Sequence, residues 1–255
     1  MPIESKLLRS RRKKILFLLL LLVFLLVGAF SLYLLVSLHD VSDLKKHNPK
    51  TTALIQLRIK NAQKKGQTLR IRQQWTSFRN VPQLLKNTVR VTEDASFYWH
   101  KGIDFEELKE SIKKNLRVGK LARGGSTITQ QLAKNLYLST EKSLFRKIKE
   151  YLIARRLEKT LSKDRIFELY LNVIELGPGV FGVQAASQYY FGRDVGDLTM
   201  EQIVRLTAII PRPLRTNPVG ESRWLKWKCR WILGKLRLYK YISEEEYEGT
   251  IQIFE

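Results

Sequence analysis

Glu93 stands among large apolar side chains in a segment that looks helical. If the helix continues to His100, one face of it carries Val89, Glu93, Phe97 and His100 at i, i+4, i+8 and i+11. A carboxylate on such a face is partly desolvated, which raises its pKa and suits a general base working near neutral pH. The alternative is a solvated acid on a helix surface, and Glu93 taken alone favours it.

A second stretch, from Gly124 to Asn135, is dense in hydrogen-bonding side chains. Its two leading glycines precede an expected helix N-terminus, where exposed N–H groups favour anions and the missing Cβ atoms permit close approach. Lys134 lies two turns along and supplies a full positive charge. The same residues would equally fit a polar loop followed by a helix cap.

A third stretch places several cations around one acid on a single helix face. Such cations would lower the pKa of the acid and form a cradle for a phosphate-bearing ligand. Most charged faces are merely solvated, so the pattern alone leaves both interpretations open. The residues on this face are Lys142, Arg146, Lys149, Glu150 and Arg156.

Together these stretches resemble the peptidoglycan glycosyltransferases, the family found alone or as the first domain of class A penicillin-binding proteins. The resemblance covers roughly Thr68 to Tyr239, and four ordered motifs of this length are highly specific. The motifs are Glu93-Asp-x-x-Phe-x-x-His-x-Gly102, Gly124-Gly-Ser-Thr-Ile-Thr-Gln-Gln131 with Lys134-Asn135, Arg146-Lys-x-x-Glu150, and Lys163-x-x-Ile-x-x-x-Tyr-Leu-Asn172.

The resemblance implies a mainly α, lysozyme-like domain that polymerises glycan strands. Glu93 would take the proton of the acceptor sugar's 4-hydroxyl, which attacks the anomeric carbon of the growing glycan. Undecaprenyl pyrophosphate then leaves and a β-1,4 bond forms with inversion. Glu150 would be the second catalytic acid, near the leaving group. The substrate-binding residues implied are Ser126, Gln130, Gln131, Lys134, Lys142, Arg146 and Lys149.

Among the positions that depart from the family pattern, Lys142 bears on the chemistry. Lys142 stands where the family often has arginine, so it keeps the charge but gives up the bidentate fork that binds phosphate. Its share of pyrophosphate binding is therefore in doubt. The basic stretch as a whole still agrees with the implied chemistry, because a departing pyrophosphate needs positive charge where negative charge develops.

Partners and cofactors follow from the same resemblance. The substrates would be lipid II and lipid-linked glycan at a membrane, with cell-wall synthesis and division proteins as candidate partners and no nucleic acid. No cofactor is expected to be obligatory, although a divalent cation, Mg²⁺ or Mn²⁺, could assist at the pyrophosphate near Glu150. No protein metal site is assigned, since Cys229 is the lone cysteine and the three histidines lack ligand spacing: His39, His47 and His100.

The chain is strongly basic, with 46 Lys+Arg against 24 Asp+Glu and a formal net charge of +22. This excess attracts anionic partners, and alone it leaves nucleic acid, acidic lipid and pyrophosphate-bearing substrates open. From Arg205 to Tyr241 the cations alternate with aromatic residues, a pattern known from nucleic-acid binding. With the domain outside the cytoplasm, we favour helix packing and contact with anionic lipid.

Residues 15–38 are uncharged and apolar, and predict a transmembrane helix. At about 1.5 Å per residue this segment is about 36 Å long, enough to cross a hydrocarbon core of about 30 Å. The basic residues 1–14 predict a cytoplasmic N-terminus, with the catalytic domain on the periplasmic side of the cell inner membrane. The alternative, a cleaved signal peptide, fits poorly because the run is long and no small-x-small site follows.

Beyond the anchor we expect a basic linker at 39–74 and a mainly α glycosyltransferase domain at 75–255, with few strands. Apolar spacing and caps predict its helices. The stripe Leu144, Ile148, Tyr151 and Leu152, after a cap at Ser143, is expected to be buried. The expected helices cover 82–100, 126–135, a segment from Ser143, a segment through Ile166 and Val173 that stops at Gly177, then 183–190, 200–210 and 222–239.

Two other functions remain to be weighed, together with a second domain. A lysozyme-like enzyme that cleaves glycan would share the fold and the glutamate, but it would not need a lysine-rich cradle. A non-catalytic, membrane-anchored binding module would need neither Glu93 nor Glu150. A transpeptidase domain would need a Lys-Thr-Gly element. None accompanies the Ser-x-x-Lys matches at Ser111 and Ser139, so we expect a monofunctional enzyme.

Overall fold

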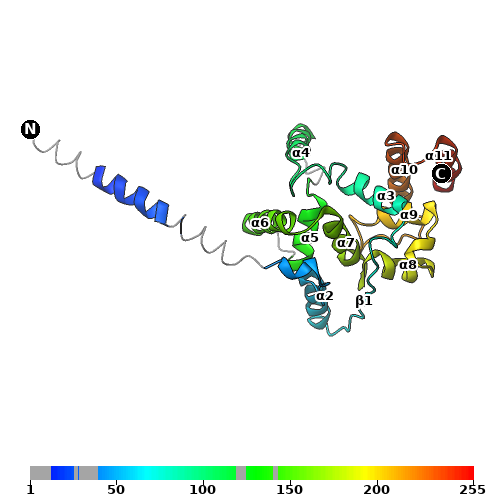
Figure 1. Ribbon diagram of the computed structural model, residues 1–255, viewed down its shortest axis with the longest axis horizontal. Helices are drawn as coiled ribbons and strands as arrows, with labels where there is room; N and C mark the ends of the chain where they lie inside the picture. Colours follow the sequence, from blue (N-terminus) through cyan, green and yellow to red (C-terminus); the bar gives the residue numbers. More distant parts are fainter. Residues whose placement is uncertain (1–12, 26–27, 29–39, 119–124, 140–142) are drawn as a thin grey trace, which may run out of the picture. The chain divides into compact units, whose positions relative to one another are not determined.

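The structure is a computed structural model that describes residues 13–25, 28, 40–118, 125–139 and 143–255 (Figure 1). The chain divides into two compact units, Met1–His39 and Asp40–Glu255. In the described residues of both units, the regular secondary structure is helical, apart from one small sheet in the second unit. The prediction of a mainly α protein is therefore confirmed.

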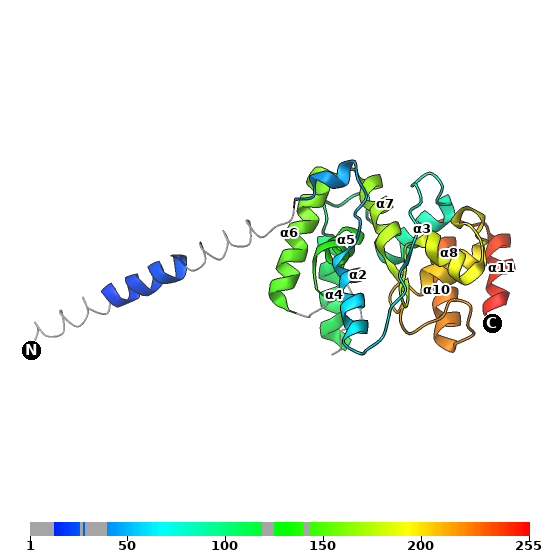
Figure 2. The ribbon, with the colours of Figure 1, turned by 90° about the horizontal axis from the view of Figure 1, so that it is seen from below.

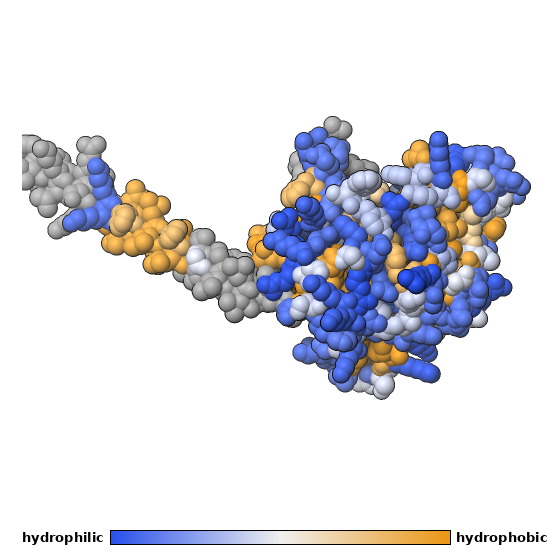
Figure 3. All heavy atoms as spheres, in the orientation of Figure 1, coloured by the Kyte–Doolittle hydropathy of each residue, from blue (hydrophilic) through white to orange (hydrophobic). Residues whose placement is uncertain are grey.

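The first unit contains a helix over residues 13–25 whose apolar side chains, from Ile15 to Leu25, are exposed (Figure 3). In the part of the chain that the structure describes, no helix is both long and apolar enough to cross a membrane. The predicted anchor, 15–38, lies partly outside the described residues, and so does most of the basic N-terminus. The transmembrane prediction therefore stays a prediction.

The second unit is built from helices around a three-stranded sheet with the order β1-β3-β2, in which β3 runs parallel to β1 and antiparallel to β2. The strands are β1 (Arg72–Gln73), β2 (Glu175–Gly177) and β3 (Val180–Phe181). The α-helices are α2 (Ala53–Gln63), α3 (Gln83–Glu93), α4 (Phe105–Val118), α5 (Ile128–Tyr137), α6 (Leu144–Thr160), α7 (Lys163–Val173), α8 (Val183–Phe191), α9 (Met200–Ala208), α10 (Arg223–Leu238) and α11 (Glu244–Ile251), with 3-10 turns at Ser42–Lys45, Val195–Asp197 and Gln252–Phe254.

Two groups of helices meet at α7. Helix α5 packs against α2, α6 and α7, while α3 packs against α9 and α10 (Figures 1 and 2). Phe97, in the loop after α3, packs on α7: the centroid of Phe167 lies 5.4 Å from that of Phe97 and 6.4 Å from that of Tyr170. All three rings are fully buried, and such packing stabilises through apolar area and ring–ring contact. It gives the end of α3 and the start of α5 a rigid base.

Residues from Asp40 onward, which include most of the segment expected to be a linker, belong to the second unit. Thr52 caps α2, and Leu54 and Ile55 are buried against Phe181. Arg58 also donates two hydrogen bonds, of 2.7 and 2.6 Å, to the carboxylate of Glu175. These partners are far away in the sequence, so the basic composition of the segment did not predict its packing.

Helix α3 ends at Glu93, so the helix predicted to reach His100 is wrong. Asp94 leaves helical geometry at φ −165° and ψ 77°, and its carboxylate accepts hydrogen bonds from the backbone N–H of Ile128 and from His100. Short polar side chains such as Asp favour these bonds over helix continuation. Glu93 and His100 therefore do not share a helix face.

Ser143 caps α6 as predicted, accepting a hydrogen bond from the N–H of Arg146 at 3.1 Å. The predicted buried stripe on this helix is wrong, because Leu144 is 79% exposed and Ile148 is 36% exposed. The inward face instead carries Glu150, Ile153, Ala154 and Leu157. Helix α6 is turned so that its acid, rather than its apolar stripe, faces the domain.

Candidate active site

Glu93 is the last residue of α3, and its carboxylate is held by a chain of hydrogen bonds. Gln131 of α5 donates from Nε2 to Glu93 Oε2 at 2.9 Å, and Tyr170 of α7 donates its hydroxyl proton to Gln131 Oε1 at 3.1 Å. Because Tyr170 occupies the amide oxygen, the amide nitrogen must face Glu93. Three helices thus fix the orientation of one carboxylate.

The pKa of Glu93 is raised above its ordinary value of 4.5, chiefly because burial penalises the charged form. The Gln131 hydrogen bond and the charges of Lys228 and Lys134 lower this pKa, while neighbouring Asp94 raises it; burial outweighs the opposing effects. A carboxylate with a raised pKa is a better proton acceptor once ionised. The sequence argument for a desolvated acid therefore holds, although its surroundings differ from those expected.

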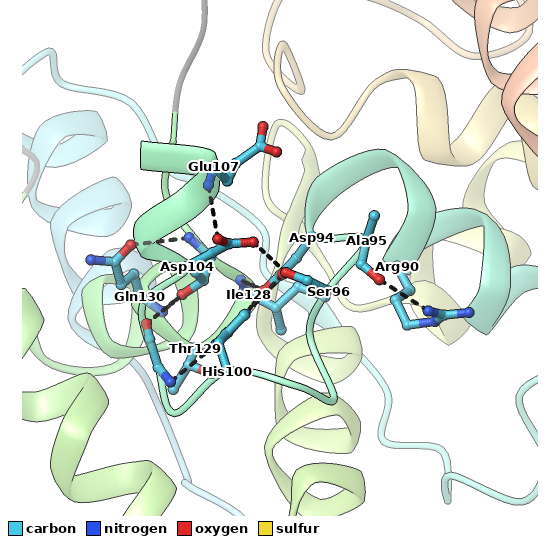
Figure 4. A network of polar contacts seen from close by, with 12 residues as sticks. Arg90, Asp94, Ala95, Ser96, His100, Asp104, Glu107, Ile128, Thr129 and Gln130 are labelled. Atoms are coloured by element: carbon cyan, nitrogen blue, oxygen red, sulfur yellow. Dashed lines mark hydrogen bonds and ion pairs between the residues drawn. The ribbon is translucent and has the colours of Figure 1, made fainter. Parts of the chain in front are cut away.

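Asp94 ties the end of α3 to the start of α5 (Figure 4). Its carboxylate accepts from the N–H of Ile128 at 2.9 Å and from His100 Nε2 at 2.9 and 3.0 Å. His100 Nδ1 accepts from the N–H of Gly102 at 3.1 Å, so the ring proton sits on Nε2. With its side chain only 2% exposed and all these bonds made, Asp94 fixes the backbone directly after Glu93.

The polar stretch at the start of α5 is a helix cap. Thr127 and Gln130 form a capping box, in which Gln130 N–H donates to Thr127 Oγ1 and Thr127 N–H donates to Gln130 Oε1. Thr127 Oγ1 also donates to the carbonyl of Gly102 at 2.8 Å. Gln130, predicted to bind substrate, thus has its amide oxygen engaged in the cap, while Gln131 faces Glu93.

Glu150 lies in a cluster of cations between α5 and α6 and is 2% exposed. Its carboxylate accepts from Arg146 Nη1 at 2.7 Å and also from Lys147 Nζ, which in turn donates to Ser126 Oγ at 2.9 Å. Burial lowers the pKa of Lys134, the charge of Glu150 raises it, and those of Arg146 and Lys147 lower it further. Three cations around one acid give this cluster a net positive charge.

The structure places Lys134 and Arg146, two of the predicted site residues, beside Glu150 and adds Lys147 to them. Lys147 was not assigned from the sequence, although its i, i+3 spacing to Glu150 is a signal for the ion pair seen here. Lys149 Nζ lies 4.9 Å from the ring centroid of Phe145 on the same helix. Lys142 falls outside the described residues, so its predicted role is untested.

A cavity of about 310 Å³ opens beside Glu93, between the ends of α3, α4 and α5 and one face of α10. The sequence analysis did not predict that Asp104 and Glu107, or the residues of α10, line this cavity. The alternation of cations and aromatics after Arg205 was the available signal, but it was assigned to packing and lipid contact. The cavity is lined by Val91, Thr92, Glu93, Asp94, Ala95, Asp104, Glu107, Gly125, Ser126, Thr127, Trp231, Lys235 and Tyr239.

The described residues do not fit a divalent cation held by the protein. Among them, no three His, Cys, Asp or Glu side chains gather at one point. Glu150, predicted to lie nearest such a cation, has each carboxylate oxygen paired with a cationic side chain. Hard divalent cations instead prefer several oxygen ligands. Cys229 is buried, which raises the pKa of its thiol to about 12.

Comparison with known proteins adds an independent observation. A family model described as Transglycosylase matches residues 61–237. The chain is 43% identical over 192 residues to the biosynthetic peptidoglycan transglycosylase of Nitrosomonas eutropha, covering 75% of this chain and 79% of that protein. Proteins of the same name from Nitrosospira multiformis and Chromobacterium violaceum are each 41% identical, covering 74% and 83% of this chain and 82% and 92% of the relatives.

Proposed function

Since this chain belongs to the transglycosylase family and is a peptidoglycan glycosyltransferase that polymerises glycan strands, we propose that Glu93 is the general base of that reaction. The observation that carries the proposal is the setting of the Glu93 carboxylate. It lines a cavity, its pKa is raised by burial, and the Gln131 hydrogen bond fixes its orientation. These are the properties that a base acting on a sugar hydroxyl requires.

In the proposed reaction, Glu93 takes the proton from the 4-hydroxyl of the GlcNAc of lipid II. The oxygen attacks the anomeric carbon of the growing glycan from the face opposite its pyrophosphate. The new C–O bond forms as the bond to undecaprenyl pyrophosphate breaks, so an α-linked donor gives a β-1,4 product. Glu93 then releases its proton to solvent, and the lengthened glycan remains on the lipid carrier of the acceptor.

The cluster around Glu150 is the proposed site of the leaving group. Lys134, Arg146 and Lys147 concentrate positive charge in a partly buried place, where it stabilises the negative charge that develops on the departing pyrophosphate. Lys142 and Lys149 are proposed to join them on the strength of their motif positions. Glu150 holds Arg146 and Lys147 in place, so its contribution is to position the cations.

Because these side chains supply the charge themselves, we propose that no divalent cation is obligatory. Polymerisation should then survive treatment with excess EDTA, with at most a few-fold loss of rate. Mg²⁺ or Mn²⁺ should accelerate it only modestly, by screening the substrate pyrophosphates. Complete loss of activity in EDTA, restored by one of these cations, would contradict the proposal.

We further propose that residues 15–38 anchor the chain in the cell inner membrane, with the N-terminus cytoplasmic and the catalytic unit on the periplasmic side. Two observations support this. The segment carries no charge and follows a basic stretch, and the apolar side chains of 15–25 are exposed. An anchored enzyme would meet lipid II and lipid-linked glycan at the surface where both are held.

The test is polymerisation of labelled lipid II by the detergent-solubilised full chain, comparing wild type with Glu93→Gln. Removing a general base should slow glycan synthesis by about 100-fold or more. The exposed Glu248→Gln on α11 is the matched control and should keep the wild-type rate. Near-normal synthesis by Glu93→Gln would refute its role as base. Cleavage of preformed strands without synthesis would favour the lysozyme-like reaction instead.

A further inference from the structure

Arg90 of α3 lies one helical turn before Glu93 and contacts two other parts of the chain. It donates from Nη1 to the carbonyl of Ala95 at 3.1 Å, the bond drawn in Figure 4, and from Nη2 to the hydroxyl of Tyr241. Its guanidinium carbon lies 5.4 Å from the ring centroid of Tyr241 and 6.0 Å from that of Tyr98. We call these contacts of Arg90 with Ala95, Tyr98 and Tyr241 the Arg90 latch.

The end of α10 is shaped so that Tyr241 reaches Arg90. Lys240 has a φ of 56°, and among the described residues it is the only one besides glycines with a positive φ. The N–H groups of Lys240 and Tyr241 donate to the carbonyls of Arg237 and Leu236, both at 2.9 Å, which is a Schellman ending of the helix. Non-glycine residues rarely adopt this conformation, and it persists where the surrounding structure fixes it. The chain is therefore strained at the residue that directs Tyr241 back toward α3.

The other ring of the latch is fixed from α7. Tyr98 donates its hydroxyl proton to Oδ1 of Asp164 at 2.9 Å, and its ring meets that of Phe97 edge-on, with 5.1 Å between the centroids. Burial, together with the hydrogen bond and the charge of Asp164, raises the pKa of Tyr98 to about 12, although the charge of Arg90 lowers it. The hydroxyl thus keeps its proton at neutral pH. Both rings beside the guanidinium of Arg90 are therefore held in place.

The spacing of Arg90 and Glu93 gives the latch a consequence for the base. An arginine and a glutamate three residues apart on a helix are neighbours and can form an ion pair. Arg165 and Glu168 have this spacing, and they form one of 2.7 Å. The hydrogen bonds of Arg90 go to Ala95 and Tyr241 instead, while the carboxylate of Glu93 accepts from Gln131. The latch therefore directs the guanidinium away from this carboxylate.

The charges that act on Glu93 come from other elements or from its neighbour. Burial raises its pKa most, Lys228 on α10 and Lys134 on α5 lower it, and Asp94 raises it. Arg90, if released, would add a cation on the same helix. The other titratable groups on the surrounding elements are Tyr170 on α7, Asp104 and Glu107 on α4, Lys235 on α10, and Arg205 on α9, which pairs with Glu201.

Resting on Glu93 as the proposed base, we propose that Arg90 is a positioning residue, whose latch supports the turn after Glu93 and keeps the guanidinium from pairing with the base. An ion pair would occupy the carboxylate that must accept the proton of the sugar hydroxyl. It would also stabilise the ionised form, which makes a weaker base. Tyr241, far from Glu93 in the sequence, thereby influences how readily the base accepts its proton.

The test measures kcat/KM for polymerisation of labelled lipid II across pH, using the detergent-solubilised full chain. Tyr241→Phe keeps the ring but removes the hydroxyl that binds Arg90, and Arg90→Lys keeps the charge but gives up the fork of two donors. In each variant the released cation should pair with Glu93. The acid limb of the profile should then move to lower pH by about 0.5 or more, and the plateau rate should fall about fivefold.

Two further variants remove the released cation. Arg90→Gln, alone or combined with Tyr241→Phe, leaves no charge to pair with Glu93, so the acid limb should stay at its wild-type position. Tyr247→Phe is the matched control, because its ring also lies against an arginine, 4.1 Å from Arg237, but on α11. It should match wild type in rate and in pH profile. Circular dichroism would verify that each variant is folded.

An acid limb that stays in place in both Tyr241→Phe and Arg90→Lys would overturn the proposal, since loss of a purely structural contact lowers the rate without moving the limb. The same shift in the variant that combines Arg90→Gln with Tyr241→Phe would overturn it as well. Glu93→Gln tests the base separately. If that variant is inactive while the limb does not move in the latch variants, only the latch fails; if it is active, the proposed function fails.

Discussion

At the scale of single residues, the proposed role of Glu93 as a base accounts for the partly buried place of its carboxylate. Removing a carboxylate from water disfavours its ionised form, and this raises the pKa of Glu93. Gln131 and two lysines reduce this effect without removing it. The balance leaves a carboxylate with a raised pKa, which accepts a proton more readily than a solvated glutamate.

The raised pKa predicts opposite effects of pH on activity and on stability. Activity needs ionised Glu93, so kcat/KM should fall with decreasing pH, with a midpoint above 4.5. The folded state binds this proton more tightly than the unfolded state, so the stability contribution of Glu93 is lost as pH rises through its folded pKa. Glu93→Gln should therefore be more stable than wild type at neutral pH, and this difference should shrink in acid. Thermal unfolding across pH measures it; a variant less stable at neutral pH would contradict the assignment.

Gln131 should act through Glu93 rather than on substrate. Its hydrogen bond lowers the pKa of Glu93, so Gln131→Leu should move the acid limb of the rate profile to higher pH and reduce activity about tenfold. Tyr170→Phe keeps the ring packing and removes only the hydroxyl bond to Gln131, so it should produce a smaller shift in the same direction. An unshifted acid limb in Gln131→Leu would indicate direct substrate contact.

At the scale of elements, the site depends on how α3 and α5 are joined at Asp94. Asp94→Asn keeps the shape but replaces one acceptor oxygen by a donor, which faces either the N–H of Ile128 or that of His100. Leaving one of these groups unsatisfied should lower the free energy of unfolding by about 1–3 kcal/mol. Urea denaturation would measure this, with the exposed Asp197→Asn as control. Equal stability of the two variants would show that the junction tolerates the lost bond.

Caps and apolar spacing within a segment predicted the helices whose positions depend on those features alone. Ser143 and Ser222, the residues at which two of the expected helices begin, cap α6 and α10. The end of α3 was mispredicted because Asp94 finds its partner in Ile128, on another helix. The orientation of α6 was mispredicted because burying Glu150 among cations outweighed burying Leu144. In both helices the outcome depends on contacts with residues far away in the sequence, which the spacing of apolar residues does not predict.

In the candidate site, too, some residues could be predicted from the sequence and others could not. Glu93, Lys134 and Glu150 could be assigned because the motifs of the family stand in order along the chain. Trp231, Lys235 and Tyr239 could not be placed at the site from the sequence, since α10 reaches Glu93 only through its packing on α3. Basic and aromatic residues at helical spacing fit several uses, and only the cavity distinguishes among them.

At the scale of the whole molecule, the boundary between the two units separates the candidate site from the segment proposed as the anchor. Every described residue of the site lies within Asp40–Glu255, while the apolar segment lies within Met1–His39. A chain starting at Asp40 should therefore fold and polymerise lipid II in detergent within a few-fold of the full chain. It should lose flotation with neutral phosphatidylcholine vesicles, because the proposed anchor would no longer insert into the bilayer.

Neutral lipid is needed, since the net charge of +22 would draw either chain to an anionic surface. If both chains floated equally, the membrane contact would reside in the catalytic unit, and the proposed anchor would be unnecessary for attachment.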